Sequence, residues 1–279
     1  MFNSDMFKDH VAVVTGGGRG IGAAACKLYA QFGAKVVVSD RDEEPTTTLV
    51  DEIKAAGGDA IGVAGDVTDP AFPKKLIDST VDAFGKVNIL VNNAGYTWDG
   101  MSHKMSDETW DAMIAVHNTA PFRLIREVAP HLRDKGKAEI AEHGAVQENR
   151  VIINISSTSG LHGNVGQINY ACAKAGIVGM TKTIAKEWGP FGVRCNAVAF
   201  GFISTRLTNA KEDGASMTVG GKEIALGIPD GMRGRATTGN PLGRPGVPEE
   251  GAGGILMMSS PLSTYVNGHC LEVTGGAGI

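Results

Sequence analysis

The fold class follows from the sequence VAVVTGGGRGIG at residues 11–22. A short run of β-branched residues leads into a glycine-rich turn, and a segment of helical character follows at once. A strand that enters a helix through such a turn is typical of the start of a doubly wound α/β sheet. The glycines permit a tight turn and let the backbone approach a phosphate group at the positive end of the helix.

The same alternation continues along the rest of the chain. Apolar runs flanked by turn residues recur with helical segments between them, as in buried parallel strands joined by crossover helices. We therefore expect one Rossmann-like doubly wound α/β domain over residues 1–279, with a seven-stranded parallel sheet and helices on both faces. The strands are expected at 11–15, 35–39, 60–64, 88–92, 150–155, 193–199 and 270–273, and the helices at 21–32, 46–56, 70–84, 107–132, 168–188 and 248–258.

Two segments interrupt this alternation. Residues 133–149 are polar and charged where about two to six residues would join a helix to a strand, so we expect an exposed insertion with room for a short helix. Residues 205–246 are rich in glycine and lack a strong period, yet they carry scattered apolar side chains. Such a segment is typical of a lid over a substrate site, although a mobile surface loop fits nearly as well.

Composition argues against several classes of partner. The 279 residues carry 26 basic and 30 acidic side chains, a formal net charge of −4, and no basic block that would favour nucleic acid or a membrane surface. The four cysteines are dispersed and lack the spacing of metal ligands, so we expect no metal. No apolar run suits a signal peptide or a membrane span, which predicts a cytoplasmic protein.

The glycine turn gains meaning from an acidic residue that follows it. Asp40 stands at the end of the next predicted strand, where a carboxylate can accept hydrogen bonds from both ribose hydroxyls of an adenine dinucleotide. The same charge would repel a 2′-phosphate, so we predict NAD rather than NADP as the cofactor. Arg19 and Arg41 weaken this prediction if either turns toward the ribose, and otherwise they are solvated surface arginines.

Two further strand ends add polar and small residues to the same edge of the sheet. Asp66, which precedes Val67, can accept a hydrogen bond from an adenine amino group or can simply cap a turn. The sequence NNAG at residues 92–95 offers amides and small side chains where a cofactor would lie, although asparagine and glycine also favour plain turns.

A tyrosine and a lysine one helical turn apart are the leading candidates for chemistry. Tyr170 and Lys174 share one face of the predicted helix 168–188, about 6 Å apart along its axis. An ammonium group roughly 5 Å from a phenol, at an effective dielectric of about 20, lowers the phenol's pKa by about two units. This predicts that the pKa of Tyr170 approaches neutrality and suits a general acid or base. Such pairs also occur by chance, so the neighbouring motifs must decide.

Together, these motifs resemble those of the short-chain dehydrogenase/reductase family. The likeness covers nearly the whole chain, from about residue 8 to residue 276. The matching motifs are the TGxxxGxG turn at 15–22, the NNAG sequence at 92–95, the final strand LEVTGG at 271–276, and catalytic residues at the usual spacing, Ser157, Tyr170 and Lys174.

The resemblance implies hydride exchange between a nicotinamide and a carbonyl or secondary alcohol. Tyr170 would pass the proton, Lys174 would lower its pKa and hold the nicotinamide ribose, and Ser157 would donate a hydrogen bond to the substrate oxygen. It also implies a homo-oligomer, commonly a tetramer, formed through the two long helices. The cofactor-binding residues expected on this basis are Gly16, Arg19, Gly20, Ile21, Gly22, Asp40, Asp66, Val67, Asn93, Ala94, Gly95, Tyr170, Lys174, Ile203 and Thr205.

The chain departs from the family pattern at two positions. The sequence VHNTAPF at 116–122 aligns with the family's VNLTGPF and puts His117, rather than Asn118, where the catalytic asparagine usually stands. An imidazole there can join a proton relay near its pKa of about 6.5, or it can merely fill the space. Phe200 precedes Gly201 where the family usually has proline, whose ring would fix the backbone that faces the nicotinamide.

The segment before the catalytic tyrosine points to a substrate class. Residues 163–170 resemble those of members that act on 3-oxoacyl or 3-hydroxyacyl thioesters, 3-hydroxyacyl-CoA dehydrogenases among them. The apolar residues of 205–246 suit an acyl chain or a steroid, and Arg233, Arg235 and Arg244 would meet the phosphates of coenzyme A or a carrier protein unless they are merely solvated. The alternatives are a hydroxysteroid or small secondary alcohol dehydrogenase and a non-catalytic NAD-binding sensor or scaffold.

Overall fold

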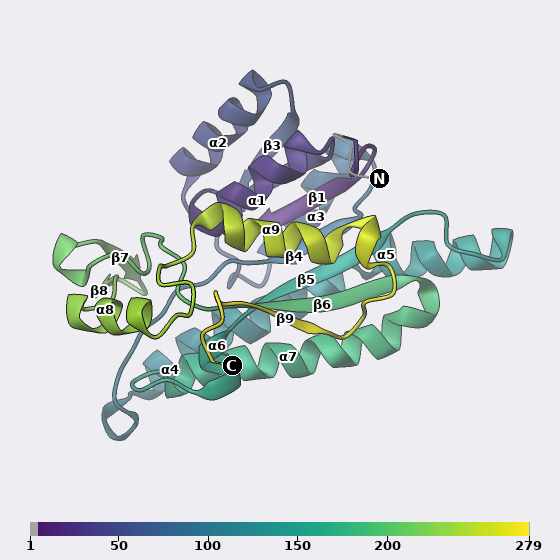
Figure 1. Cartoon of the computed structure of the whole chain (residues 1–279). Helices are drawn as coiled ribbons and strands as arrows, with labels where there is room; N and C mark the ends of the chain where they lie inside the picture. The colour runs from purple at the N-terminus through teal and green to yellow at the C-terminus, as the bar shows by residue number, and fades with distance from the viewer. Residues whose placement is uncertain (1–4, 279) are drawn as a thin grey trace.

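A computed structural model describes residues 5–278, apart from the side chains of residues 232 and 235, and shows one large parallel sheet (Figure 1). The strand order is β3-β2-β1-β4-β5-β6-β9, and every neighbouring pair is parallel. The seven expected strands are confirmed to within two residues at either end. They are β1 (Val11–Thr15), β2 (Lys35–Asp40), β3 (Asp59–Ala64), β4 (Ile89–Asn92), β5 (Arg150–Ser157), β6 (Val193–Phe200) and β9 (Cys270–Val273).

Helices cover both faces of this sheet, which explains why its central strands are buried along their whole length. All residues of β1, β5 and β6 are buried. Two apolar clusters, one on each face, hold the layers together. One face carries α1 (Gly20–Gln31), α2 (Glu43–Ala55) and α9 (Pro248–Ser259), and the other carries α3 (Phe72–Phe84), α5 (Ala120–His143) and α7 (Ile168–Trp188).

The strand order reverses beside β1, and this reversal positions the site. The chain builds outward from β1 to β2 and β3, then returns to place β4 on the other side of β1. In open sheets of this kind, ligands bind outside the carboxyl ends of the strands at the point of reversal. The glycine turn follows β1, Asp40 is the last residue of β2, and the NNAG sequence begins with the last residue of β4.

The helix expected at 107–132 is interrupted and longer than predicted. It begins as α4 (Asp107–Ile114), where the Ser106 hydroxyl accepts a hydrogen bond from the Thr109 amide at 3.2 Å. A π-helical segment, η2 (Ala115–Thr119), then leads into α5. Such segments often lie at functional sites because they displace the backbone locally.

Residues 133–143 do not form an insertion with a helix of its own; they are the last turns of α5. Two long-range contacts hold this extension in place. Gly136 packs against Phe191, whose carbonyl oxygen would lie 2.0 Å from an added Cβ, and Glu139 forms an ion pair with Arg150 at 2.5 Å. The exposed connection is therefore limited to residues 144–149.

Residues 205–246 contain regular structure that the sequence pattern did not predict. A 3-10 turn, η4 (Lys211–Asp213), precedes an antiparallel hairpin of β7 (Ser216–Val219) and β8 (Lys222–Ala225), and α8 (Asp230–Thr238) follows. Gly220 and Gly221, both at positive φ, make the two-residue turn of the hairpin. Figure 1 shows the hairpin and α8 together beyond one end of the sheet. Across residues 5–278, no helix is long and apolar enough to cross a membrane.

Candidate active site

The glycine turn after β1 is shaped by close backbone approach. Gly16 has φ +61°, and a Cβ at this position would lie 2.8 Å from the Cα of Ala94. A Cβ at Gly22 would lie 2.1 Å from the carbonyl oxygen of Gly16. Neither position has space for a side chain, so the turn stays tight and its backbone remains open to a phosphate at the start of α1.

Hydrogen bonds fasten the NNAG sequence to this turn. The side-chain amide of Asn93 donates to the carbonyl oxygens of Thr15 and Gly16 at 2.9 and 3.0 Å. The Thr15 hydroxyl accepts from the backbone amides of Asn93 and Ala94 at 3.0 and 3.1 Å. Thr15 was not predicted as a site residue, although it is the first residue of the TGxxxGxG pattern.

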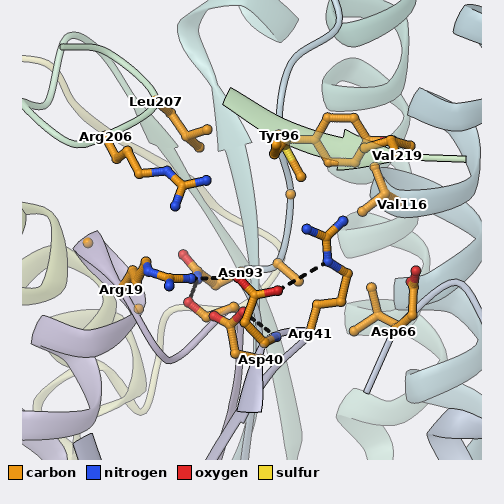
Figure 2. A pocket seen from close by; sticks show the side chains of 18 of the residues that line it. Arg19, Asp40, Arg41, Asp66, Asn93, Tyr96, Val116, Arg206, Leu207 and Val219 are labelled. Carbon is orange, nitrogen blue, oxygen red and sulfur yellow. Dashed lines mark hydrogen bonds and ion pairs between the residues drawn. The ribbon is translucent and has the colours of Figure 1, made fainter. Parts of the chain in front are cut away.

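A cavity of about 620 Å³ opens above this edge of the sheet (Figure 2). Its volume lies within the range of about 300–1,000 Å³ that small-molecule and cofactor pockets occupy. Ile203 is not in its lining but is buried and forms a β-bridge with Gly246. The predicted cofactor residues that do line it are Gly16, Arg19, Gly20, Ile21, Gly22, Asp40, Asp66, Val67, Asn93, Ala94, Gly95 and Thr205.

The hairpin β7–β8 forms another wall of this cavity. Met217 and Val219 from β7 line it, and Leu226 just after β8 joins them. Arg41 donates a hydrogen bond to the carbonyl oxygen of Thr218 at 2.8 Å. Part of the segment that was expected to cover the substrate therefore lies over the Asp40 end of the cofactor cavity.

The end of the cavity that contains Asp40 also contains two arginines, and both already form ion pairs. In Figure 2, Arg19 and Arg41 lie on either side of Asp40. Asp40 accepts a hydrogen bond from the Gly18 amide at 3.0 Å, while Arg19 and Arg41 pair with Asp42 at 2.7 and 3.5 Å. The hydrogen bond from Arg19 is the main cause that lowers the pKa of Asp42.

Asp66 serves the turn after β3 as well as the cavity. Its carboxylate accepts hydrogen bonds from the Thr68 amide and hydroxyl at 2.8 and 2.7 Å. The capping role considered from the sequence is therefore present. Because Asp66 and Val67 also line the cavity, the two roles coexist.

The three catalytic candidates come together at the carboxyl end of β5, and none of them is among the residues that line the cavity. The predicted cofactor contacts of Tyr170 and Lys174 therefore stay predictions. Ser157 ends β5, and Tyr170 and Lys174 lie one turn apart on α7. Lys174 is 5% exposed, donates a hydrogen bond to the Ile155 carbonyl at 2.7 Å, and has its Nζ atom 5.6 Å from the centre of the Tyr170 ring. Ser157 accepts a hydrogen bond from the Ser159 amide at 3.2 Å and also bonds to Tyr170.

Burial raises the pKa of Tyr170, whereas the sequence predicted a lowered pKa. Desolvation raises the pKa of Tyr170 to about 12, against a lowering by the hydrogen bond with Ser157 and a further rise from the charge of Asp99. Burial also lowers the pKa of Lys174 to about 7. The expected approach of the Tyr170 pKa to neutrality is wrong because it counted only attraction to an ammonium and omitted desolvation of both groups. Tyr170 therefore keeps its proton at neutral pH.

His117, rather than Asn118, lies next to Tyr170. Its ring meets the Tyr170 ring edge-on, with centres 5.1 Å apart and planes at 85°. A Cβ on Gly95 would lie 2.3 Å from the His117 ring, so the histidine occupies space that only glycine leaves free. Asn118 instead donates a hydrogen bond to the Ala173 carbonyl at 3.0 Å and ties η2 to α7.

The imidazole of His117 is neutral. Desolvation and then the charge of Lys174 hold its pKa well below 6.5. Its Nε2 atom lies 2.8 Å from the Tyr96 carbonyl oxygen and must donate to it, which leaves Nδ1 as a buried acceptor with no partner among the described residues. The expectation of a group that titrates near 6.5 is therefore wrong for this environment.

The backbone at Phe200 is held in place although the proline that is usual at this position is missing. Phe200 is the last residue of β6 and pairs with Ser157 of β5 and Val273 of β9. Its side chain is 8% exposed and belongs to one of the two apolar clusters. The ladder on both sides and the core contacts hold the backbone that a proline ring would otherwise restrict.

Sequence reasoning missed a polar group at the start of α7. Asn169 is fully buried and donates to the carbonyl oxygens of Trp98 and Thr109 at 3.0 and 3.2 Å. Gln167 donates to the carboxylate of Asp99 at 3.0 and 3.2 Å. Both residues lie within three positions of Tyr170, and this closeness in the sequence is the signal that could have identified them.

The arginines expected at a coenzyme's phosphates have acidic partners where they are described. Arg244 forms two hydrogen bonds with Glu250, at 2.8 and 2.6 Å, and Arg233 bonds to Asp230 at 3.2 Å. The Arg235 side chain lies outside the described part of the chain.

Comparison with known proteins decides the family. A family model described as short chain dehydrogenase matches residues 10–216. The chain belongs to this family. Full-length similarity supports the match, because the 3-oxoacyl-[acyl-carrier-protein] reductase of Thermotoga maritima is 37% identical over 266 residues, 95% of this chain and 96% of the relative.

Other relatives of this short-chain dehydrogenase carry different names. The short-chain reductase protein NovJ of Streptomyces niveus is 37% identical over 269 residues, 96% of this chain and 94% of the relative. The 2,5-dichloro-2,5-cyclohexadiene-1,4-diol dehydrogenase of Sphingobium indicum is 35% identical over 266 residues, 95% of each. The protein is thus an oxidoreductase of CH–OH or keto groups from a family that binds a nicotinamide cofactor, which confirms the predicted family, fold and enzyme class and removes the non-catalytic alternative.

Proposed function

We propose that this short-chain dehydrogenase uses NAD(H) to interconvert a 3-oxoacyl and a 3-hydroxyacyl thioester. One observation carries the substrate class: the likeness to 3-oxoacyl-[acyl-carrier-protein] reductases extends over 95% of the chain. The segment before Tyr170, which the sequence associates with acyl thioesters, supports the same substrate class.

The residues around the glycine turn fit a dinucleotide. A side chain at Gly16 or Gly22 would fill the cradle, and the cavity above it has the volume of a cofactor pocket. We propose that this backbone holds the pyrophosphate and that Asp40 accepts hydrogen bonds from the adenosine ribose. Asp42 supports NAD over NADP because it already neutralises Arg19 and Arg41.

We assign proton transfer to Tyr170. The bound nicotinamide supplies or accepts the hydride. A phenol that keeps its proton at pH 7 suits ketone reduction, where it donates that proton to the oxygen of the substrate as negative charge develops there. Ser157 donates a second hydrogen bond to this oxygen, and positive charge on Lys174 stabilises the resulting phenolate.

In this proposal His117 is a positioning residue. Its neutral ring packs edge-on against Tyr170 and its Nε2 atom is held by the Tyr96 carbonyl. Gly95 leaves the space for the ring. The arrangement limits the orientations that the Tyr170 ring can take.

A small secondary alcohol dehydrogenase is the second candidate. The likeness to the cyclohexadienediol dehydrogenase of Sphingobium indicum, at 35% identity over 95% of the chain, favours it. The two candidates share the chemistry of Tyr170 and differ in what surrounds the reacting carbon.

A substrate panel separates the two candidates. NADH oxidation is measured with the N-acetylcysteamine thioester of 3-oxobutyrate, and NAD reduction is measured with a cyclic diol, simple secondary alcohols and a hydroxysteroid. We expect kcat/KM for the thioester to exceed the others by at least about tenfold, comparable to the discrimination that a few contacts supply. A higher kcat/KM for the diol would transfer the assignment to the second candidate.

Cofactor choice is tested by titration with NADH and NADPH. The wild-type protein should bind NADH more tightly. Asp42→Asn should raise the affinity for NADPH because it leaves Arg19 and Arg41 free to meet a 2′-phosphate. Asp51→Asn, an exposed carboxylate on α2, controls for the change in net charge. Tighter binding of NADPH by the wild-type protein would refute the choice of NAD.

Three further points remain predictions. We propose a homo-oligomer formed through α5 and α7, which leave Phe122 and Ile168 half exposed on the monomer. We propose that residues 205–246 act as a lid whose hairpin covers the adenosine end of the pocket. A cytoplasmic location also stays a prediction.

A further inference from the structure

The loop after β4 is fastened to the start of α7 beside the catalytic tyrosine. Asn169 donates to the Trp98 carbonyl, and the Gly100 amide donates to the Gly166 carbonyl at 2.8 Å. Gln167 forms a β-bridge with Gly100. Asp99 lies in the middle of this tethered segment, so its position relative to α7 is fixed from both sides.

The carboxylate of Asp99 is held by Gln167 alone among the described side chains. The Gln167 amide donates to both of its oxygens, at 3.2 and 3.0 Å, and no described lysine or arginine forms an ion pair with it. Desolvation raises the pKa of Asp99, while the hydrogen bond from Gln167 and the charge of Lys211 on η4 act in the opposite direction. Asp99 nevertheless stays open to solvent.

A chain of hydrogen bonds links Asp99 to the reaction centre through Gln167, Ser159 and Ser157. The charge of Asp99 also disfavours the ionised form of Tyr170. The groups that face Asp99 are thus Gln167, which directly precedes α7, Tyr170 on α7 and Lys211 from η4. A substrate whose carbonyl oxygen bonds to Tyr170 must place its neighbouring atoms in the same field.

We propose that Asp99 is a specificity-determining residue that disfavours substrates with a negative charge a few bonds from the reacting carbon. This inference rests on the proposed function and deepens it. A 3-oxoacyl thioester is neutral at C1, whereas the free 3-oxo acid has a carboxylate there, two carbons from the ketone. Two like charges a few ångströms apart repel each other even where solvent partly screens them.

Removal of the charge leaves the surrounding hydrogen bonds nearly intact. Gln167 also accepts a hydrogen bond from the Ser159 hydroxyl at 2.9 Å, and the Ser159 amide donates to Ser157. Asp99→Asn keeps a carbonyl oxygen for Gln167 and so preserves the orientation of this network. The substitution changes charge with little change of shape.

The test compares neutral and anionic substrates of matched carbon skeleton in wild type and Asp99→Asn. The first pair is the N-acetylcysteamine thioester of 3-oxobutyrate and free 3-oxobutyrate. The second is pentan-2-ol and 4-hydroxypentanoate, which serves if no thioester is turned over. Asp51→Asn is the control for net charge. We expect Asp99→Asn to raise the ratio of kcat/KM for the anion to that for the neutral substrate by about tenfold.

Two accompanying readouts separate charge from shape. High salt should reduce the discrimination of the wild-type enzyme more than that of Asp99→Asn. The pH profile of the oxidation reaction should move to lower pH in Asp99→Asn, because Tyr170 loses a neighbouring negative charge. Equal ratios in the two proteins would overturn the role of Asp99. Failure of every thioester, with the ratio still shifted for the second pair, would overturn the proposed substrate class but not this role.

Discussion

Two buried cations lie near opposite ends of the same sheet, and they are held in different ways. Arg194, near the start of β6, is 7% exposed and donates six hydrogen bonds. Lys174, beside the carboxyl end of β5, is 5% exposed and donates to one carbonyl oxygen, that of Ile155. The many hydrogen bonds of Arg194 favour stability of the fold. The single hydrogen bond of Lys174 leaves its ammonium group able to bind a ligand.

The partners of Arg194 explain its structural role. They include the carbonyl oxygens of Met258, Ser259 and Ser260 at the end of α9, where unpaired carbonyls and the negative end of the helix dipole favour a cation. Burial lowers its pKa to about 10, so it stays charged at neutral pH. Burial lowers the pKa of Lys174 to about 7, where small changes in its surroundings alter its charge.

Two buried polar atoms without a partner in the described part of the chain lie on β4 and η2. The Nδ1 atom of His117 and the Oδ1 atom of Asn92 have none among the described residues. Unpaired buried polar groups lower stability by about 1–3 kcal/mol each. Asn92 directly precedes Asn93, and His117 packs against Gly95, both of which line the cavity, so the loss of stability falls where a site would tolerate it for the sake of function.

The largest expected effect comes from Lys174→Met. It removes the charge that stabilises the Tyr170 phenolate, and kcat should fall by about 10²–10⁴, the range that proton-transfer groups contribute. Lys186→Met, on the exposed side of the same helix, is the matched control. Steady-state kinetics with NADH would show the difference, and a Lys174→Met enzyme with normal kcat would remove Lys174 from the proposed mechanism.

Arg194→Met should have the opposite consequence. It leaves several buried carbonyl oxygens without a donor, so the free energy of unfolding should fall by about 3 kcal/mol or more. Urea denaturation measures this, with the exposed Arg126→Met expected to stay within about 0.5 kcal/mol of wild type. At 25 °C the folded Arg194→Met enzyme should keep its kcat. A loss of kcat with unchanged stability would contradict the contrast between the two cations.

The pH dependence of stability sharpens the contrast further. The pKa of Lys174 is about 7 in the folded protein and 10.5 ordinarily, so between these values the unfolded state binds more protons. Stability attributable to Lys174 therefore rises with pH across this window, by up to about 1.4 kcal/mol per pH unit. The unfolding free energy of wild type minus that of Lys174→Met should therefore rise from pH 7 to pH 10. A constant difference would mean that burial does not lower this pKa.

The smallest expected effect concerns His117→Asn. Loss of the ring contact with Tyr170 should lower kcat by about tenfold, while the pH–rate profile between pH 6 and 8 should not move because the imidazole is neutral there. A profile that shifts with this substitution would restore the titrating relay that the sequence suggested.

Much of this fold and site was predictable because the features that mark them lie close together in the sequence. The strands are buried on both faces and therefore appear as continuous apolar runs, and Gly16 and Gly22 are glycine because close backbone contacts leave no room for Cβ. The spacing of Tyr170 and Lys174 needed only helical geometry.

The features that sequence reasoning missed depend on distant contacts. The extension of α5 relies on Glu139 and its ion pair with Arg150, and the hairpin β7–β8 has too few buried side chains to show an alternating pattern. The pKa of Tyr170 depends on how tertiary packing desolvates the phenol, which spacing along one helix does not reveal.

The central claim is that Tyr170 transfers the proton in the reaction of this oxidoreductase. Tyr170→Phe removes only the hydroxyl and keeps the ring that packs against His117. Reduction of the 3-oxobutyryl thioester by NADH should fall by about 10²–10⁴ in kcat, while the dissociation constant of NADH stays within a few-fold of wild type. Turnover at the wild-type rate, with any substrate of the panel, would contradict the account.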